Sequence, residues 1–485
     1  MGFISWGYYL FLAVLLAVYY LLPHKIRWAA LLGGSLVFCC LYNIYSAIWL
    51  AAVALLSFAA ARGIASLREK DKVGAAKGIL AASLVAFFGS LFAIKYSRAC
   101  LRLFEVWGHT GGGEGADAFI SIAMPVGISF YLFQVTGYLI DVYRKKTEAV
   151  RHFGHYFLSL AFFPKLAQGP IAPVEQLAPQ FGDRKRLDPL SMRKGAVRIL
   201  IGLIKKAVIA DRLAVIADSV FTAPGQLSAL STAIGIVCYA FQLYTDFAGY
   251  TDVAIGTAQM FGIVLPENFK QPYLARSVAD FWRRWHLTLS NWLREYIYFP
   301  LGGSRVRTVR WAINVLIVFL VSGMWHGSGL TFIIWGAIHA LYQIIGKLTA
   351  GPRTALKTKL FGKKVIACDI LSVASTFVLI CAAWTFFRAD SSGNAVKMLA
   401  RLACGDWSFS LAQLGVNAAE CWTSLILVIL VIAADLISRR ASILEWIENR
   451  VLPIRWMIYL VMLFVLILFG MYGSLSAQSF IYVSF

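Results

Sequence analysis

Two histidines in aromatic, otherwise apolar sequence are the strongest candidates for chemistry in this chain. His286 occurs in FWRRWHLTLSNWLREYIYFPLGG and His326 in VSGMWHGSGLTFIIWGAIHA. An ionisable ring is costly to hold in an apolar environment, so its presence there indicates a functional site. A neutral imidazole can accept a proton from a hydroxyl group as general base. The simpler alternative is a core histidine that only hydrogen-bonds across helices.

The position of each histidine follows from the helix expected around it. If one helix begins near Trp311, His326 lies roughly 22 Å along it at 1.5 Å per residue, past the middle of a bilayer. The glycines at 327 and 329 would let a substrate or another backbone approach closely. His286 is less deeply placed, on an amphipathic helix from Ala279 to Pro300 that lies at an interface or lines a cavity.

The amphipathic stretch has two predicted faces. One face carries Trp282, Trp285, Leu289, Trp292 and Tyr296, and the other carries Arg283, His286, Ser290 and Arg294. Its neighbouring arginines, Arg283 and Arg284, could pair with phosphates of a substrate or simply with lipid headgroups. The residues expected to contact substrate around the two histidines are Trp325, Asn291, Arg283, Arg284, Trp285, Ser290 and Asp246.

The segment YTDFAGYTDVAIG places two carboxylates, Asp246 and Asp252, in apolar sequence. Six residues turn a helix by about 600°, so the two carboxylates point roughly 120° apart and form no catalytic dyad on a regular helix. Each is expected to bond a neighbouring helix or backbone, and a proton relay is the alternative. His152 and His155 form an HxxH pair, which we interpret as part of a solvated loop rather than half of a metal site. No metal and no disulfide framework are expected.

The composition predicts a polytopic membrane protein that holds these residues on an all-α scaffold. Of the 485 residues 60% are hydrophobic and 14% charged, and the mean hydropathy is +0.71. Apolar runs of membrane length fall at 3–22, 28–43, 45–62, 78–96, 118–140, 195–220, 228–258, 311–325, 330–346, 366–387, 422–437 and 456–474. The stretch from Leu158 to Phe181 contains four prolines and predicts a re-entrant or interfacial segment instead of a straight helix.

The formal charge of +21 does not indicate binding to nucleic acid, because the cations are scattered between apolar spans. The positions of these cations indicate instead how the chain is oriented in the membrane. Basic residues gather in alternate loops, at 25–27, 62–77 and 144–151. By the positive-inside rule these loops are cytoplasmic and the N-terminus is periplasmic. We expect one membrane domain over residues 1–485, with N-terminal helices 1–117, a core 118–346 and C-terminal helices 347–485.

Several motifs together resemble the membrane-bound O-acyltransferase (MBOAT) family, most closely its bacterial alginate O-acetylation branch. These motifs are PVGISFYLFQVTGYLIDVYR, FFPKLAQGPI, QLYTDFAGYTDVAIG, PENFKQPYLARSVADFWRRWHLTLSNWLREYIYFPLGG, SGMWHG, WTFFRAD and the terminal FIYVSF. The resemblance implies a bundle of about 11–12 membrane helices around a central tunnel, with a cytoplasmic funnel for the thioester and an opposite opening for the hydroxyl acceptor. His326 matches the family's catalytic histidine, and His286 matches its second histidine position.

The resemblance also implies the reaction and its partners. An acetyl group would pass from acetyl-CoA, or another cytoplasmic acyl thioester, across the bacterial inner membrane to a periplasmic acetyltransferase partner or to an exported polysaccharide such as alginate. No cofactor besides the acyl donor is expected. Transfer of D-alanyl groups from a carrier protein is the nearest alternative. A glycan or lipid transporter that uses Asp246 and Asp252 for coupling, and a scaffold for an envelope complex, are more distant ones.

Overall fold

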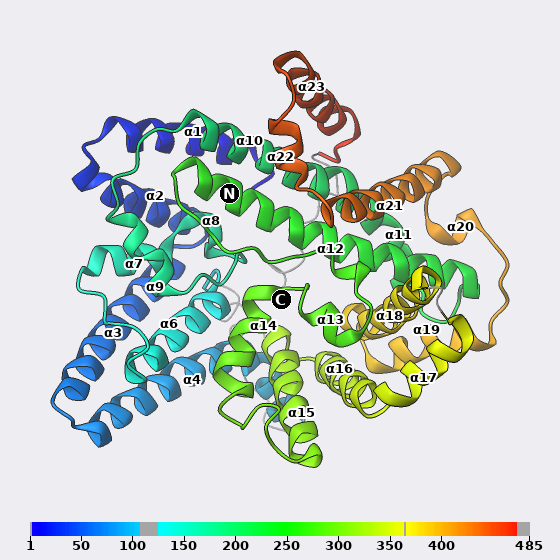
Figure 1. The fold of residues 1–485 in the computed structure, drawn as a ribbon, viewed down its shortest axis with the longest axis horizontal. Coiled ribbons are helices and arrows are strands. Elements are labelled where there is room, and N and C mark those ends of the chain that lie inside the picture. Colours follow the sequence, from blue (N-terminus) through cyan, green and yellow to red (C-terminus); the bar gives the residue numbers. More distant parts are fainter. Residues whose placement is uncertain (1, 107–124, 363–364, 473–485) are drawn as a thin grey trace. The chain divides into compact units, whose positions relative to one another are not determined.

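A computed structural model describes residues 2–106, 125–362 and 365–472. Within these ranges every regular element is a helix, as the sequence predicted (Figure 1). The contacts divide the chain into two compact units. Unit 1 comprises Met1–Ile199 and Tyr250–Pro266, and unit 2 comprises Leu200–Gly249 and Glu267–Phe485. The expected single domain with three sections stays a prediction.

Unit 1 is built mainly from the N-terminal helices of the chain. They are α1 (Trp6–Leu21), α2 (Arg27–Tyr42), α3 (Ile44–Glu69), α4 (Val73–Val106), α6 (Ile128–Tyr143), α7 (Phe153–Ala161), α8 (Phe163–Leu166), α9 (Val174–Leu177) and the start of α10 (Pro189–Leu203). The proline-rich stretch is divided among α7, α8, α9 and a 3₁₀ turn, Pro179–Phe181. A proline ring fits only the first turn of a helix, so the prediction that this stretch is no straight helix is confirmed.

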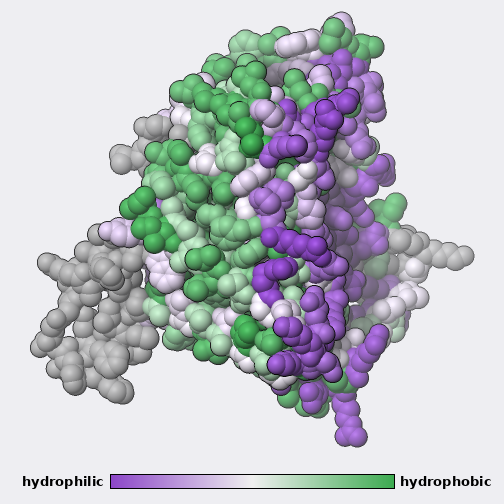
Figure 2. Space-filling model, turned by 90° about the vertical axis from the view of Figure 1, so that its left-hand side faces the viewer, coloured by the Kyte–Doolittle hydropathy of each residue, from purple (hydrophilic) through white to green (hydrophobic). Residues whose placement is uncertain are grey.

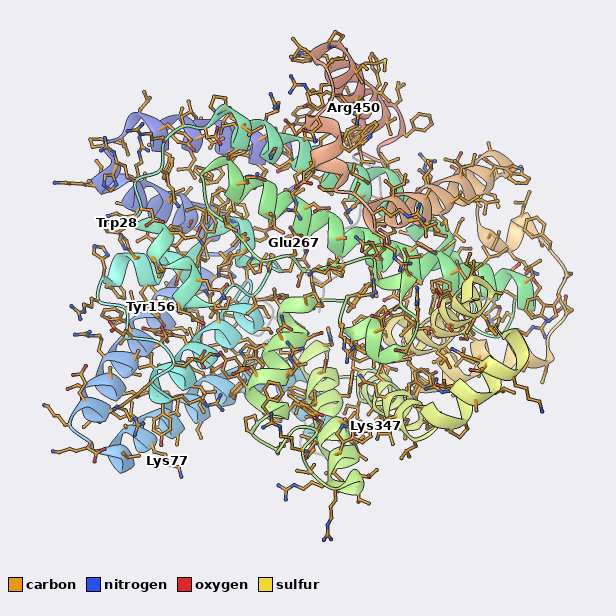
Figure 3. The ribbon with its side chains drawn as sticks, in the orientation of Figure 1. Trp28, Lys77, Tyr156, Glu267, Lys347 and Arg450 are labelled. Atoms are coloured by element: carbon orange, nitrogen blue, oxygen red, sulfur yellow. The ribbon has the colours of Figure 1, made fainter. Side chains whose placement is uncertain are left out.

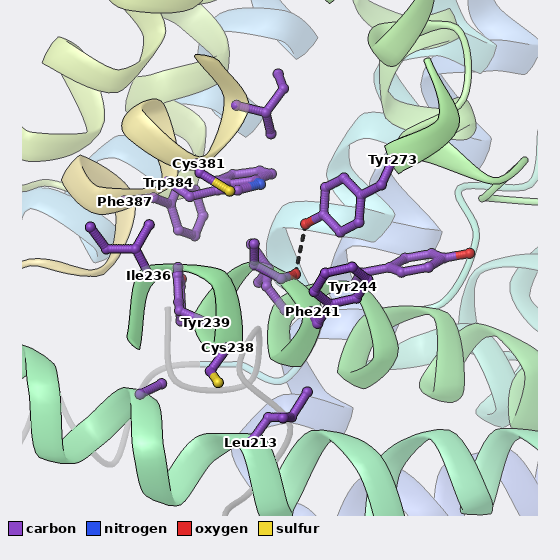
Figure 4. Packing of buried hydrophobic residues seen from close by; sticks show 14 of the residues in the cluster. Leu213, Ile236, Cys238, Tyr239, Phe241, Tyr244, Tyr273, Cys381, Trp384 and Phe387 are labelled. Atoms are coloured by element: carbon purple, nitrogen blue, oxygen red, sulfur yellow. Dashed lines mark hydrogen bonds between the residues drawn. The ribbon is translucent and has the colours of Figure 1, made fainter. Parts of the chain in front are cut away.

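Unit 2 holds the two predicted histidines. Its helices are the π-helix Ile204–Ala210, α11 (Asp211–Phe221), the first part of α12 (Ala229–Met260), α13 (Val278–Trp282), α14 (Leu287–Leu293), the π-helix Arg294–Tyr298, α15 (Thr308–His326), α16 (Leu330–Leu348), α17 (Ala350–Phe361), α18 (Val365–Arg388), α19 (Ser392–Cys404), α20 (Leu411–Leu414), α21 (Ala418–Ser438), α22 (Ile443–Glu448) and α23 (Leu452–Phe469). Aromatic side chains fill its core, where the Tyr273 hydroxyl donates to the Ala240 carbonyl at 2.6 Å (Figure 4).

Eight helices of the described chain are long and apolar enough to cross a membrane, which makes this a multi-pass membrane protein. They are His24–Tyr42, Ile44–Glu69, Val73–Tyr96, Thr308–His326, Leu330–Leu348, Ile366–Arg388, Ala418–Ser438 and Leu452–Phe469. In the last two, only 11% and 6% of the most apolar 18 residues are buried, so most of their side chains are available for contact with lipid. Figure 2 shows a broad hydrophobic surface beside a strip of hydrophilic residues. The start of the predicted span 118–140 and the FIYVSF end lie outside the described residues.

The prediction of one amphipathic helix from Ala279 to Pro300 is wrong. Helix α13 ends at Trp282, and α14 begins at Leu287. Between them His286 has φ 43°, a left-handed conformation that cannot continue a right-handed helix. The turn directs the His286 ring inward, away from the polar face on which the periodicity placed it.

Helices α15 and α16 form a hairpin whose close packing depends on two glycines. A Cβ added at Gly323 would lie 2.4 Å from the Phe332 carbonyl oxygen, and one at Gly336 would lie 2.3 Å from the Phe319 carbonyl oxygen. Both obstacles are backbone atoms, so neither can rotate away. The two helices therefore approach as closely as small residues permit, as is common between membrane helices.

Gly336→Ala should destabilise the hairpin by about 1–3 kcal/mol, because the methyl group must push the backbones apart. The measurement is the thermal unfolding midpoint of the purified protein in detergent. Gly33→Ala is the matched control, since Gly33 is also helical but has open space around the position of a Cβ. An equal change in both variants would show that close packing at Gly336 does not matter.

Candidate active site

His326 is the last residue of α15 and lies in a setting of aromatic rings. The helix starts at Thr308, three residues before the predicted start, so His326 is about 27 Å along it and at its end. The His326 ring centroid is 4.8 Å from Trp325, 5.1 Å from Trp335 and 5.2 Å from Phe387. Only 3% of the residue is exposed. A substrate can reach this ring only through a narrow opening or after one of the surrounding rings moves.

The structure brings the second predicted histidine to the same tryptophan. The His286 ring is 6.2 Å from the Trp325 ring and 4.8 Å from that of Phe247. His286 is fully buried, which corrects the expectation that it shares a polar face with the arginines. Both histidines therefore contact Trp325 within unit 2, although they stand 40 residues apart in the sequence.

Asn268 holds the His286 ring and fixes which nitrogen carries the proton. The Asn268 Oδ1 atom lies 3.2 Å from the His286 Nδ1 atom and accepts hydrogen bonds from the backbone N–H and the hydroxyl of Thr288. A backbone N–H only donates, so the atom it reaches must be the amide oxygen, and His286 Nδ1 must be a donor. Burial lowers the pKa of His286 to about 3. At neutral pH the ring is thus uncharged, with its lone pair on Nε2.

Asn268 has no role in the sequence prediction, although it lies within the PENFKQPY motif. Its position 18 residues before His286 gives no periodic signal. The only signal that could have singled it out is an amide side chain within the same motif as the histidine.

Asn268→Ala should lower the acyl-transfer rate by about 10–100-fold, because the His286 ring loses the partner that orients it. Asn268→Asp should restore most of the rate, since a carboxylate accepts the same hydrogen bonds. The added negative charge should also raise the pKa of His286, so activity should begin to fall at a higher pH than in the unaltered protein. The measurement is the pH profile of transfer for all three proteins. If the acid limb does not move in Asn268→Asp, Asn268 does not act on His286.

The other predicted substrate contacts have varied surroundings, and their contact with substrate stays a prediction. Trp285 is buried, with its ring 5.1 Å from that of Trp384. The Ser290 hydroxyl donates to the Trp285 carbonyl at 3.1 Å. Arg284 pairs with Asp280 at 2.9 Å. The remaining two are exposed side chains, Arg283 and Asn291, and the Asn291 Oδ1 atom accepts from Arg294 at 2.8 Å.

Both aspartates of the YTD repeat bond a neighbouring helix, as expected. Asp246 pairs with Lys206 at 2.7 Å in unit 2, and Asp252 pairs with Arg198 at 3.0 Å in unit 1. Helix α12 runs unbroken through Gly249, so the two carboxylates form no dyad. Lys206 was not singled out from the sequence, although a lysine in the apolar stretch 195–220 is itself a signal for a buried charge partner.

Three further histidines have structural partners. The His152 Nδ1 atom accepts from the His155 backbone N–H at 3.2 Å and caps α7, and the two rings stack with centroids 4.1 Å apart. In unit 2, the Trp282 indole N–H donates to His339 Nδ1 at 3.2 Å. This contact joins α13 to α16.

Comparison with known proteins places the chain in a family. The sequence model of the MBOAT, membrane-bound O-acyltransferase family, matches residues 37–387. The chain is 40% identical over 300 residues to a Pseudomonas syringae pv. tomato protein named "Probable alginate O-acetylase AlgI". These residues make up 61% of this chain and 55% of that protein. It is 35% identical over 414 residues to the protein of the same name from Pseudomonas putida. These residues make up 83% of this chain and 80% of that protein.

The name of a third relative refers to a different polymer. It is the "Peptidoglycan O-acetyltransferase" of Helicobacter pylori, 38% identical over 327 residues that make up 62% of this chain and 60% of the relative. The family match includes α3, α12, α15 and the two histidines that contact Trp325. Because that match covers more than half of the sequence, this protein belongs to the membrane-bound O-acyltransferase family.

Proposed function

We propose that this O-acyltransferase moves an acetyl group from cytoplasmic acetyl-CoA to a hydroxyl group outside the inner membrane, on an exported polysaccharide or on a periplasmic acetyltransferase that passes it on. The observation that carries the proposal is that the His286 and His326 rings both lie beside the Trp325 ring, 6.2 Å and 4.8 Å from its centroid, inside a buried aromatic site. Relatives named for O-acetylation of alginate and of peptidoglycan support acetyl as the group transferred.

In the proposed mechanism His326 is the general base. Its imidazole accepts the proton of the acceptor hydroxyl while that oxygen attacks the thioester carbonyl carbon. The candidate donors for stabilising the resulting oxyanion are the Trp325 indole, which lies beside the His326 ring, and the exposed Asn291 amide. The carbon–sulfur bond then breaks, the CoA thiolate takes up the proton from His326, and the ester leaves. This mechanism requires no acyl-enzyme.

The proposed orientation follows from the basic loops. Lys25 and Arg27, the loop after α3 and the loop after α6 lie on the cytoplasmic side, and the N-terminus is periplasmic. Helix α15 starts within the basic segment 305–310, so its far end, with His326, is directed toward the periplasm. The acetyl group must then pass most of the membrane thickness before it meets the acceptor.

The test combines a strain and the purified protein. A strain without this protein should lose O-acetyl esters from one secreted or envelope polymer, and complementation should restore them. The purified protein should release CoA from acetyl-CoA when a hydroxyl acceptor is present, with no carrier protein. If transfer occurs only from a carrier protein that bears a D-alanyl group, the acetyl proposal is wrong.

A further inference from the structure

A second candidate binding site lies in unit 1, where the last turns of α3 meet the segment that follows α6. The two segments enclose a pocket of about 360 Å³, which is within the range of roughly 300–1,000 Å³ usual for small-ligand sites. Its lining residues are Arg62, Ala65, Arg68 and Glu69 from α3, and Val142, Lys145, Lys146, Thr147, Glu148, Ala149 and Arg151 from and after α6.

The charge of this pocket is strongly positive. Five of its lining side chains are cations and two are carboxylates, Glu69 and Glu148. Lys146 pairs with Asp141 at 3.5 Å. Within the described part of the chain, the other four cations form no ion pair. These cations repel one another, and a bound anion would reduce that repulsion.

Arg68 gives the pocket a specific need for an acceptor. Its guanidinium lies over the Tyr143 ring, 5.2 Å from the ring centroid, and the side chain is half-buried. The Arg68 Nε atom is shielded from solvent and has no hydrogen-bond acceptor among the described residues. A buried donor on a charged group is costly when it has no partner. An anionic oxygen in the pocket would supply that partner.

The backbone brings the cations together from distant parts of the sequence. Helix α6 ends at Tyr143, and Lys145 has φ 57°, so the chain reverses there. The Lys146 backbone N–H bonds back to the Asp141 carbonyl and closes this turn. Orienting a chain in a membrane requires only that basic residues lie on one side. It does not require cations almost 80 residues apart to line one hollow.

We propose that this pocket binds a phosphate-bearing ligand. Arginine forks match the oxygens of a phosphate group bidentately, and lysines add charge. The phosphate can come from two sources. One is the nucleotide part of CoA, which rests on the proposed function. The other is the headgroup of an anionic phospholipid in the adjacent leaflet, which does not.

The test uses the full-length protein with two pairs of substitutions. Arg68→Gln/Arg151→Gln removes two cations, one of them the half-buried Arg68. Arg62→Gln/Lys145→Gln removes two exposed cations, in case the first variant does not fold. Lys77→Gln is the matched control, because Lys77 is a basic residue in the first turns of α4 that does not line the pocket (Figure 3). Each protein is measured with CoA and with acetyl-pantetheine by calorimetry in neutral detergent. Retention of phosphatidylglycerol is measured by native mass spectrometry.

The outcomes distinguish the two sources without any assay of acyl transfer, so failure of the proposed function does not bear on them. A loss of about tenfold or more in CoA affinity, with acetyl-pantetheine unaffected, supports a nucleotide phosphate. A similar loss of phosphatidylglycerol retention, with CoA binding unchanged, supports a lipid headgroup. The proposal is overturned if both pocket variants bind both ligands as the unaltered protein does, or if Lys77→Gln loses as much.

Discussion

His326→Ala should lower acyl transfer by about 10²–10⁴-fold, the usual contribution of a general base. The acceptor hydroxyl then has no group to take its proton as it attacks the thioester. The measurement is CoA release from acetyl-CoA by the purified protein, with and without a hydroxyl acceptor. Transfer at the normal rate by this variant would dismiss His326 as the catalytic base.

Packing at His326 makes the choice of control important. The ring contacts three aromatic side chains and is almost completely buried, so its removal also leaves a cavity. His326→Gln keeps much of the volume and a polar head but cannot accept the proton. It should be as inactive as His326→Ala while its unfolding temperature stays closer to that of the unaltered protein. Recovery of activity in His326→Gln would indicate that the ring only fills space.

Eight of the twelve spans expected from hydropathy match helices of the described chain that are long and apolar enough to cross a membrane. Hydropathy finds such helices because a helix in lipid must be apolar over its full length and must satisfy its backbone internally. The expected span at 330–346, for example, is α16, Leu330–Leu348. The prolines between 158 and 181 were equally informative, since their effect on a helix is local. Both signals depend on residues close together in the sequence, and this is why they could be interpreted without a structure.

The surroundings of His286 could not be predicted in the same way. Helical periodicity assigns each residue to a face only while the helix continues, and at His286 it does not. The left-handed turn is accompanied by hydrogen bonds from the Thr288 backbone and side chain to Asn268, which lies in a separate loop segment. A non-glycine residue adopts this conformation at a cost that only such tertiary contacts can offset.

The same limit applied to Asp246. The sequence showed that its carboxylate needed a partner, but the partner, Lys206, is 40 residues away on a π-helix. Insertions of this kind within α-helices are frequent at functional sites and shift the register of the side chains that follow. To predict this ion pair one must know how the two helices pack against each other. The sequence pattern of each segment by itself does not give that information.

Lys206→Met should destabilise unit 2 by about 3–5 kcal/mol, the largest effect on stability that we expect from a single substitution here. The Lys206 ammonium lies 2.7 Å from an Asp246 oxygen and 2.8 Å from an Asp211 oxygen, and all three side chains are at most 2% exposed. Removal of the cation leaves two buried carboxylates beside an apolar side chain. The measurement is the thermal unfolding midpoint in detergent.

A triple variant separates charge from shape at this site. In Lys206→Met/Asp211→Asn/Asp246→Asn no charge is left without a partner, so much of the lost stability should return, since whole buried ion networks can often be replaced at little cost. If the triple variant is as unstable as Lys206→Met, packing of the lysine stem rather than charge pairing stabilises the site. Its acyl-transfer rate then decides the role of Asp246. A well-folded but inactive triple variant would mean that the network of Lys206, Asp211 and Asp246 serves the reaction as well as stability, whereas normal transfer would leave Asp246 a structural charge alone.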